Sequence, residues 1–279
     1  MSSESMAPDV AAPLRSETGK NPIVFRGGGF APHRIRFMAA ATFALVLALW
    51  WLSTTLGWIS ELALPRPWDV LGSLIEMVTN GTLAKHLAAS LQRLAIGWTL
   101  GAIAGVTVGF AVGLSSIARS TALPLVSAIF PIPKIALLPL FILWLGIGEV
   151  SKVATIAFGV FSPMVIATFG GVDTVDRGLI RMAQSFGVPT WTIIRRIVLP
   201  GAMPALLSGA RISASIAIIL LTAAEMIGAK YGVGAMVLAA GNLMQTDQLV
   251  AGVLILSALG FSVSQAIGWA ERRLLRWRL

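Results

Sequence analysis

Four stretches of the sequence run for 20 to 25 residues without a charged side chain: Phe37–Leu56, Leu94–Ala118, Val153–Val172 and Gln248–Ala270. A helix rises about 1.5 Å per residue, so each stretch is long enough to cross a hydrocarbon layer of about 30 Å. Only 12% of the residues are charged and 56% are hydrophobic, whereas about a quarter of the residues in a soluble domain are charged. The four stretches therefore predict membrane-spanning helices.

Two further apolar regions are less regular. Ser120–Gly148 contains one charge, Lys134, and is interrupted by four prolines, which remove backbone donors and kink helices. It is either one kinked crossing or a half-helix followed by a crossing. Ala205–Gly228 contains Arg211 and Glu225. The prediction is an all-α membrane protein with about six transmembrane helices, of which the third is irregular.

Lysine and arginine are unevenly distributed between the predicted spans. With the N-terminus inside, 14 of these residues fall in segments on the cytoplasmic side and 4 in outer segments. The positive-inside rule therefore predicts that both termini are cytoplasmic. Residues 1–33, rich in Pro, Gly, Ser and Ala, are expected to form a flexible cytoplasmic tail. The net charge of +9 needs no nucleic acid to explain it.

Several kinds of site are not expected on this chain. It has no cysteine and two histidines, His33 and His86, so the sequence offers no convincing metal site. It also lacks the phosphate-binding pattern G-x-x-x-x-G-K-[ST]. No cofactor is expected to bind this chain, and any ATP hydrolysis must occur on another polypeptide.

The polar stretch "MAQSFGVPTWTIIRRIVLP" interrupts the apolar sequence between the fourth and fifth predicted spans. Asp176 can cap a helix that ends at Gly187 in the left-handed conformation. Pro189 can then open a second short helix, and Pro200 is expected to end it. The residues expected on one face of the first helix are Leu179, Met182, Ala183 and Phe186. A rigid knob of this kind suits a soluble partner better than lipid.

This stretch resembles the cytoplasmic loop E-A-A-x-x-x-G-x9-I-x-L-P of permease subunits of ATP-binding-cassette (ABC) importers. Ala183, Gly187 and the I-x-L-P end match its spacing, whereas Arg181 and Met182 replace the Glu and the first Ala. In that family the loop is the coupling helix, which fits a cleft in the ATPase subunit. The resemblance implies an ATPase-coupling role for Arg181, Met182, Ala183, Phe186, Gly187, Arg195, Arg196, Ile197, Leu199 and Pro200. The adjacent arginines equally suit a positive-inside anchor.

Longer segments are similar to the nitrate, sulfonate and taurine branch of these permeases. They are "FPIPKIALLPLFILWLGIGEVSK", "AEMIGAKYGVGAMVLAAGNLMQTDQLVAGVLI" and the final "ERRLLRW". The resemblance implies a type I ABC-importer transmembrane domain over residues 34–279, with a coupling loop at about 173–203. It also implies a plasma (inner) membrane location and a small anionic substrate such as nitrate, a sulfonate, taurine or a related organic acid.

The same resemblance implies the partners. These are a cytoplasmic ABC ATPase dimer that binds ATP and Mg, a second permease copy, expected to form a homodimer, and an external substrate-binding protein. The chain would form the substrate pathway and switch access from one side of the membrane to the other.

The candidates for the pathway or its gate are Phe130, Lys134, Trp144, Arg211, Glu225 and Met226. A charge at the centre of a span costs about 2.5–3.5 kcal/mol on insertion scales. Arg211 therefore either lines the pathway or extends to the cytoplasmic surface. Glu225 is expected to hydrogen-bond the glycine-rich turn after it, and Lys134 marks a cytoplasmic gate or the membrane edge. The aromatic residues and Met226 either close a pore or pack.

The segment "GWTLGAIAGVTVGFAVG", residues 97–113, is rich in small residues that allow helices to approach closely in lipid. It predicts a tightly packed bundle and a dimer interface, but it does not indicate which surface forms that interface.

Two other classes of function have to be considered. An ion-coupled secondary transporter working without an ATPase would show inverted repeats, broken helices and ionisable groups near the midplane. The proline-broken third crossing fits this class, but the sequence shows no convincing internal repeat and few proton sites. An intramembrane enzyme would need paired carboxylates, a metal cluster or an activated nucleophile, and the sequence offers no such set.

Overall fold

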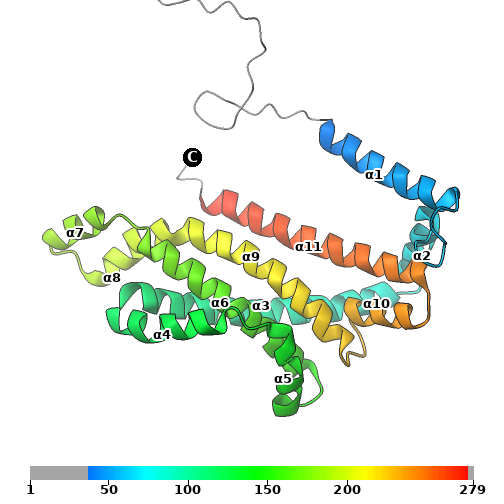
Figure 1. The fold of residues 1–279 in the computed structure, drawn as a ribbon. Coiled ribbons are helices and arrows are strands. Elements are labelled where there is room, and N and C mark those ends of the chain that lie inside the picture. The colour runs from blue at the N-terminus through cyan, green and yellow to red at the C-terminus, as the bar shows by residue number, and fades with distance from the viewer. Residues whose placement is uncertain (1–36, 276–279) are drawn as a thin grey trace, which may run out of the picture. The chain divides into compact units, whose positions relative to one another are not determined.

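A computed structural model describes residues 37–275, which are helical apart from the turns that connect the helices (Figure 1). The expected tail, 1–33, lies outside the described residues. Contacts divide the chain into Met1–Ala48 and Leu49–Leu279, and each unit is described by itself. The elements are α1 (Met38–Thr55), α2 (Pro67–Thr79), α3 (Thr82–Leu114), α4 (Ser116–Ile129), η1 (Lys134–Leu137), α5 (Leu138–Leu145), α6 (Glu149–Asp173), α7 (Arg177–Ser185), α8 (Thr190–Ile193), η2 (Ile194–Val198), α9 (Leu199–Met226), α10 (Val233–Asn242) and α11 (Thr246–Leu274).

Five helices are long and apolar enough to cross a membrane: α1, α3, α6, Thr190–Met226 and α11. Ser116–Ile129 and Lys134–Leu145 pass the same test only as a pair, and they meet at an angle of 91°. Counted as one span, this pair is the irregular third crossing and brings the number of candidate spans to the six expected. Because α5 has only 8 residues, it is too short to be a complete crossing after a half-helix. By length and composition, the segment is either a broken span or a re-entrant loop.

The glycine-rich segment packs α3 against α6. Five glycines spaced four residues apart, at 97, 101, 105, 109 and 113, face α6. A Cβ atom on Gly101 would lie 2.3 Å from the carbonyl oxygen of Ala157, so only glycine permits this approach. The predicted tight packing is confirmed. The face of α3 that carries these glycines is occupied by α6 of the same chain.

The centre of the Leu49–Leu279 unit is α6, which contacts both α3 and α9 (Figure 1). Its buried apolar side chains include Ile156, Val160 and Met164, which pack with Leu220 and Leu221 of α9. A long apolar helix can be buried on several faces only when its neighbours surround it. The core of the bundle therefore lies along α6.

A smaller core lies where α2 and α10 meet α11. Val70 and Met77 of α2 pack with Val233 and Met236 of α10 and with Ala251 of α11. The Ser73 hydroxyl also donates a hydrogen bond to the Asp247 carboxylate in the first turn of α11. The amphipathic pattern of α2 thus buries one face in protein. We call this end of the bundle the α10 end, and the opposite end, where α7 lies, the α7 end.

Candidate functional site

The segment between α6 and α9 begins as the sequence predicts. The Asp176 side chain accepts a hydrogen bond of 2.7 Å from the Gly178 amide and caps α7. At the other end of α7, Gly187 has φ +69°. The Val188 amide donates to the Ala183 carbonyl at 3.1 Å, which closes the helix in the manner of a Schellman motif. The cap and the left-handed glycine are both confirmed.

The expected stop at Pro200 is wrong. The helix that begins at Thr190 continues to Met226 without a break, through the π-helical turn η2 and past Pro200 in the first turn of α9. Proline lacks an amide hydrogen and its ring clashes with the carbonyl four residues earlier. The wider π-helical turn places that carbonyl differently, which accommodates the ring. The residues from Thr190 to Val198 are therefore continuous with a helix that is long and apolar enough to cross a membrane.

The apolar residues of α7 divide between two faces. Ala183 is buried and packs with Ile193, Val198 and the partly buried Ile180. Leu179, Met182 and Phe186 are exposed. The prediction that Ala183 lies on the same face as these three residues is therefore wrong. Trp191 of α8 is 71% exposed and Phe186 is 80% exposed. We call these four exposed side chains, Leu179, Met182, Phe186 and Trp191, the apolar knob.

The remaining coupling candidates occupy different environments. Arg181, Arg195 and Arg196 are exposed, whereas Ile197, Leu199 and Pro200 are partly buried where η2 joins α9. The exposed arginines can contact an anionic group of another molecule. The partly buried residues instead pack where η2 joins α9 and stabilise the backbone there.

Two pathway candidates meet at the break in the third crossing. The Lys134 ammonium group donates a hydrogen bond to the Phe130 carbonyl and lies 5.0 Å from the centre of the Phe130 ring. From the start of α4 to this break is 14 residues of helix, or about 21 Å. Lys134 therefore lies at the bend between the two helices of this pair. Trp144 lies further along, in α5, with its ring 6.2 Å from that of Phe141.

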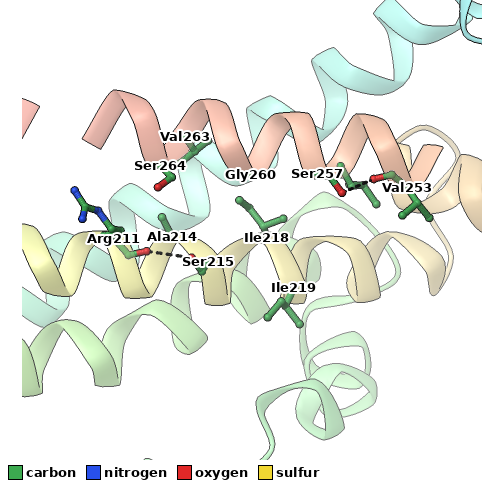
Figure 2. Close-up of a pocket in the computed structure, with 11 residues that line it drawn as sticks. Arg211, Ala214, Ser215, Ile218, Ile219, Val253, Ser257, Gly260, Val263 and Ser264 are labelled. Carbon is green, nitrogen blue, oxygen red and sulfur yellow. Dashed lines mark hydrogen bonds between the residues drawn. The ribbon is translucent and has the colours of Figure 1, made fainter. Parts of the chain in front are cut away.

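Arg211 lies at one end of a cavity of about 370 Å³ between α9 and α11 (Figure 2). Its guanidinium group donates to Glu271 in the last turn of α11 at 2.5 Å. Three hydroxyl groups line the same cavity, from Ser215, Ser257 and Ser264, and the other lining residues are aliphatic or glycine. The cavity thus combines one paired cation with apolar walls, which suits a small anionic molecule better than a metal ion.

Glu225 belongs to a buried charged cluster at the α10 end. Its side chain has no exposed surface and accepts a hydrogen bond of 2.9 Å from the Gly234 amide. This confirms the predicted bond to the glycine-rich segment that follows it. Arg93 Nη1 donates to Glu225 Oε1 at 2.7 Å, and the Ser90 hydroxyl donates to the same carboxylate. Met226 follows at the end of α9 and is partly buried.

Sequence reasoning did not identify Arg93 as part of a site. Its side chain is 5% exposed and also binds both oxygens of Glu149 at the start of α6. Its Nη1 donates to the Tyr231 carbonyl at 2.6 Å. The sequence offered one indication of such a role: Arg93 is a charged residue directly before the charge-free run Leu94–Ala118. Its partners lie 56 and 132 residues away in the sequence. The cluster joins α3, α6 and α9 at the α10 end.

The described part of the chain, 37–275, holds no group of three or more His, Asp or Glu side chains placed to bind a metal ion. Its charged clusters instead pair arginines with carboxylates. Examples are the Arg93 group, which includes Glu225 at the end of α9, and the Arg211–Glu271 pair, near the middle of α9.

Comparison with known proteins places this arrangement among transport proteins. Residues 97–276 match the family described as "Binding-protein-dependent transport system inner membrane component". The taurine transport system permease protein TauC of Escherichia coli (strain K12) is 36% identical over 86% of this chain and 89% of that protein. A putative aliphatic sulfonates transport permease protein SsuC of Bacillus subtilis (strain 168) is 36% identical over 84% of this chain and 85% of that protein.

A solved structure of the MetNI methionine ABC transporter, in an inward-facing conformation, has the same fold. Its matching chain superposes with a TM-score of 0.60 at 20% identity, over 69% of this chain and 96% of that one. The chain therefore belongs to the family of inner-membrane components of binding-protein-dependent transport systems, as the multi-pass permease subunit of an ABC importer that works with a separate ATPase and a substrate-binding protein.

Proposed function

We propose that this permease imports small sulfonates, with taurine and short alkanesulfonates as the substrate class. The observation that carries the proposal is the 36% identity to the taurine permease, which extends over 86% of this chain. The sulfonate permeases of the same family, at 36% and 33% identity, support the same class. A sulfonate is a compact, permanently charged anion, and arginine is well suited to bind such a group.

Two cations are placed to attract such an anion. Lys134 lies at the break of the third crossing and Arg211 lies at the end of the cavity between α9 and α11. Ser208, Arg211 and Ser215 are exposed on one face of α9. Serine and arginine are poorly matched to lipid, so we place this face on the substrate pathway. Phe130 and Trp144 would then narrow the pathway, and Met226 would contribute at its outer end, with Glu225 holding the outer end of α9.

Two copies of the chain would enclose this pathway. One copy leaves this face of α9 exposed, including Ile212 and Ile219 beside the polar residues, and a second copy would cover it. We propose a homodimer, with residues 34–279 as one transmembrane domain and both termini in the cytoplasm. The distribution of Lys and Arg supports this orientation.

The segment at about 173–203 would then be the cytoplasmic coupling loop. The apolar knob supports this assignment, because exposed Phe and Trp side chains beside arginines are typical anchors of protein interfaces. The continuous helix Thr190–Met226 supports it as well. Movement of an ATPase against the knob would be transmitted directly along α9 to the pathway. Closure of the ATPases on ATP would in this way switch access from outside to inside.

Uptake by the reconstituted importer tests the substrate class. The permease, its ATPase and its binding protein would be placed in proteoliposomes with ATP inside, and uptake of labelled taurine, ethanesulfonate and nitrate would be measured. We expect ATP-dependent uptake of the two sulfonates and little uptake of nitrate. Preferential uptake of nitrate, or of a substrate without a sulfonate group, would overturn the proposal.

A further inference from the structure

A second cavity, of about 310 Å³, lies at the α7 end, between the ends of α3 and α6 and one face of α7. Its described lining includes three arginines, Arg119, Arg177 and Arg181, and one carboxylate, Asp173. Most of its lining belongs to the proposed coupling loop, but neither the contact proposed for the apolar knob nor the proposed pathway uses the cavity itself. Its excess of positive charge indicates an anionic ligand.

The arginines are arranged around the cavity rather than scattered on the surface. Asp173 Oδ1 accepts from Arg119 at 3.2 Å and from Arg177 at 3.4 Å, so one carboxylate holds two guanidinium groups together. The Arg119 guanidinium also lies 4.7 Å from the centre of the Phe169 ring. Arg181 follows Arg177 by one helical turn on α7, so both face the same cavity. Guanidinium groups converging in this way suit the oxygens of a phosphate.

Apart from Gln184 and Gly113, the other walls of the cavity are apolar. They are formed by Leu114, Val172, Val175, Ile180 and Val198. A free inorganic ion would gain nothing from these walls, whereas a phospholipid carries glycerol and acyl groups beside its phosphate. The lining therefore favours an amphipathic anion.

The cavity also lies at the level where the spans end. Leu114 is the last residue of α3 and Asp173 the last residue of α6, and both helices are membrane spans. With the orientation given under the proposed function, on which this inference rests, that level is the cytoplasmic boundary of the hydrocarbon. Anionic lipids there attract basic pockets between transmembrane helices.

We infer that this cavity binds the phosphate of an anionic lipid headgroup. The lipid tethers the first turns of α7 to the membrane surface, while the apolar knob on the other face of α7 remains available to the ATPase. Coupling then depends on the lipid composition of the cytoplasmic leaflet.

Native mass spectrometry of the purified permease–ATPase complex tests the inference, with phosphatidylglycerol and phosphatidylcholine added as probes. We expect the complex to retain phosphatidylglycerol selectively. The variant R177Q/R181Q should bind it about 30-fold more weakly, because it removes two basic groups from the cavity. The matched control is R272Q/R273Q, which removes two exposed arginines from the end of α11, outside the cavity. It should retain the selectivity.

Three results would overturn the inference. Equal loss in the two double variants would mean that lipid binds by general attraction to basic residues. Binding of inorganic phosphate alone, with displacement of the lipid, would identify a free ion as the ligand. Loss of the ATPase from R177Q/R181Q with unchanged lipid binding would mean that an acidic group of the ATPase occupies the cavity. Lipid binding is measured without any substrate. A failure of the sulfonate proposal in the uptake assay can therefore be told apart from a failure of the lipid inference.

Discussion

Arg93 and Glu225 are charged side chains that lie almost wholly inside the protein. Taking charges out of water is costly, and the cost is offset only when each charge has a partner and further hydrogen bonds. Here Ser90, the Gly234 amide and the Tyr231 carbonyl supply those bonds. Removing Glu225 would leave the buried Arg93 with the exposed Glu149 as its remaining charged partner.

Glu225→Gln should therefore destabilise the permease by about 3 kcal/mol, since it removes the fully buried carboxylate that pairs with Arg93. Thermal unfolding in detergent would measure the loss. Glu149→Gln is the matched control, because it removes the other carboxylate bound to Arg93 from a side chain that is 65% exposed. We expect the control to cost about 1 kcal/mol or less. Equal losses would contradict the importance given to burial.

Arg211 carries the positive charge of the α9–α11 cavity and forms an ion pair with Glu271. Its role in attracting the substrate can therefore be tested separately from its role in the ion pair. If the charge attracts a sulfonate, Arg211→Ala should reduce uptake at least 10-fold, whereas Arg211→Lys should retain much of it. Glu271→Gln is the control, because it removes the ion pair but leaves the cation in place. Uptake and the apparent KM for taurine would be measured in proteoliposomes. If Arg211→Ala and Glu271→Gln behave alike, Arg211 serves the ion pair and not the substrate.

At the scale of the element, α7 depends on the conformation of the residue that ends it. Gly187 has φ +69° and its amide donates to the Gln184 carbonyl at 2.9 Å. Proline cannot adopt that φ and has no amide hydrogen. Gly187→Pro should uncouple ATP hydrolysis from uptake while membrane insertion remains normal. Gly187→Asn should be tolerated, because asparagine adopts the left-handed region readily. Loss of insertion in the proline variant would count against a role in coupling.

The packing of α3 on α6 is a second feature at this scale, and a substitution that adds one methyl group can test it. Gly101→Ala places a methyl group 2.3 Å from a backbone oxygen, so the two helices must separate. Overpacking of this kind typically costs about 1–3 kcal/mol. Gly170→Ala is the matched control, since a Cβ atom at this α6 position meets nothing within 4 Å. A lower unfolding temperature is expected for the first variant alone. Similar behaviour of both variants would mean that α6 can shift without cost.

At the scale of the whole molecule, the importer depends on a contact between polypeptides. Phe186→Asp places a charge in the apolar knob, and we expect it to abolish co-purification of the ATPase in mild detergent. Buried charges at the centre of an interface are strongly unfavourable. Leu243→Asp, at an exposed residue at the end of α10, should retain the ATPase. Retention by both variants would exclude the knob as the principal contact.

Much of this protein is determined by short-range patterns in its sequence. The charge-free runs predicted the spans, because hydrocarbon excludes charge whatever the surrounding fold. Asp176 and Gly187 were placed correctly, because a cap and a left-handed turn depend on a few neighbouring residues. The spacing of Gly187 and the I-x-L-P end indicated the family for the same reason. The roles of the individual coupling and pathway residues remain predictions.

The tertiary structure decided which distant residues meet. Arg93 and Glu225 lie 132 residues apart in the sequence, and nothing local indicates that they form a pair. The glycine stripe of α3 predicted close packing but not its partner, which is α6 of the same chain. The helix also continues through Pro200, because a π-helical turn before it accommodates the ring. Sequence patterns describe one segment at a time, whereas burial and pairing depend on the segment packed against it.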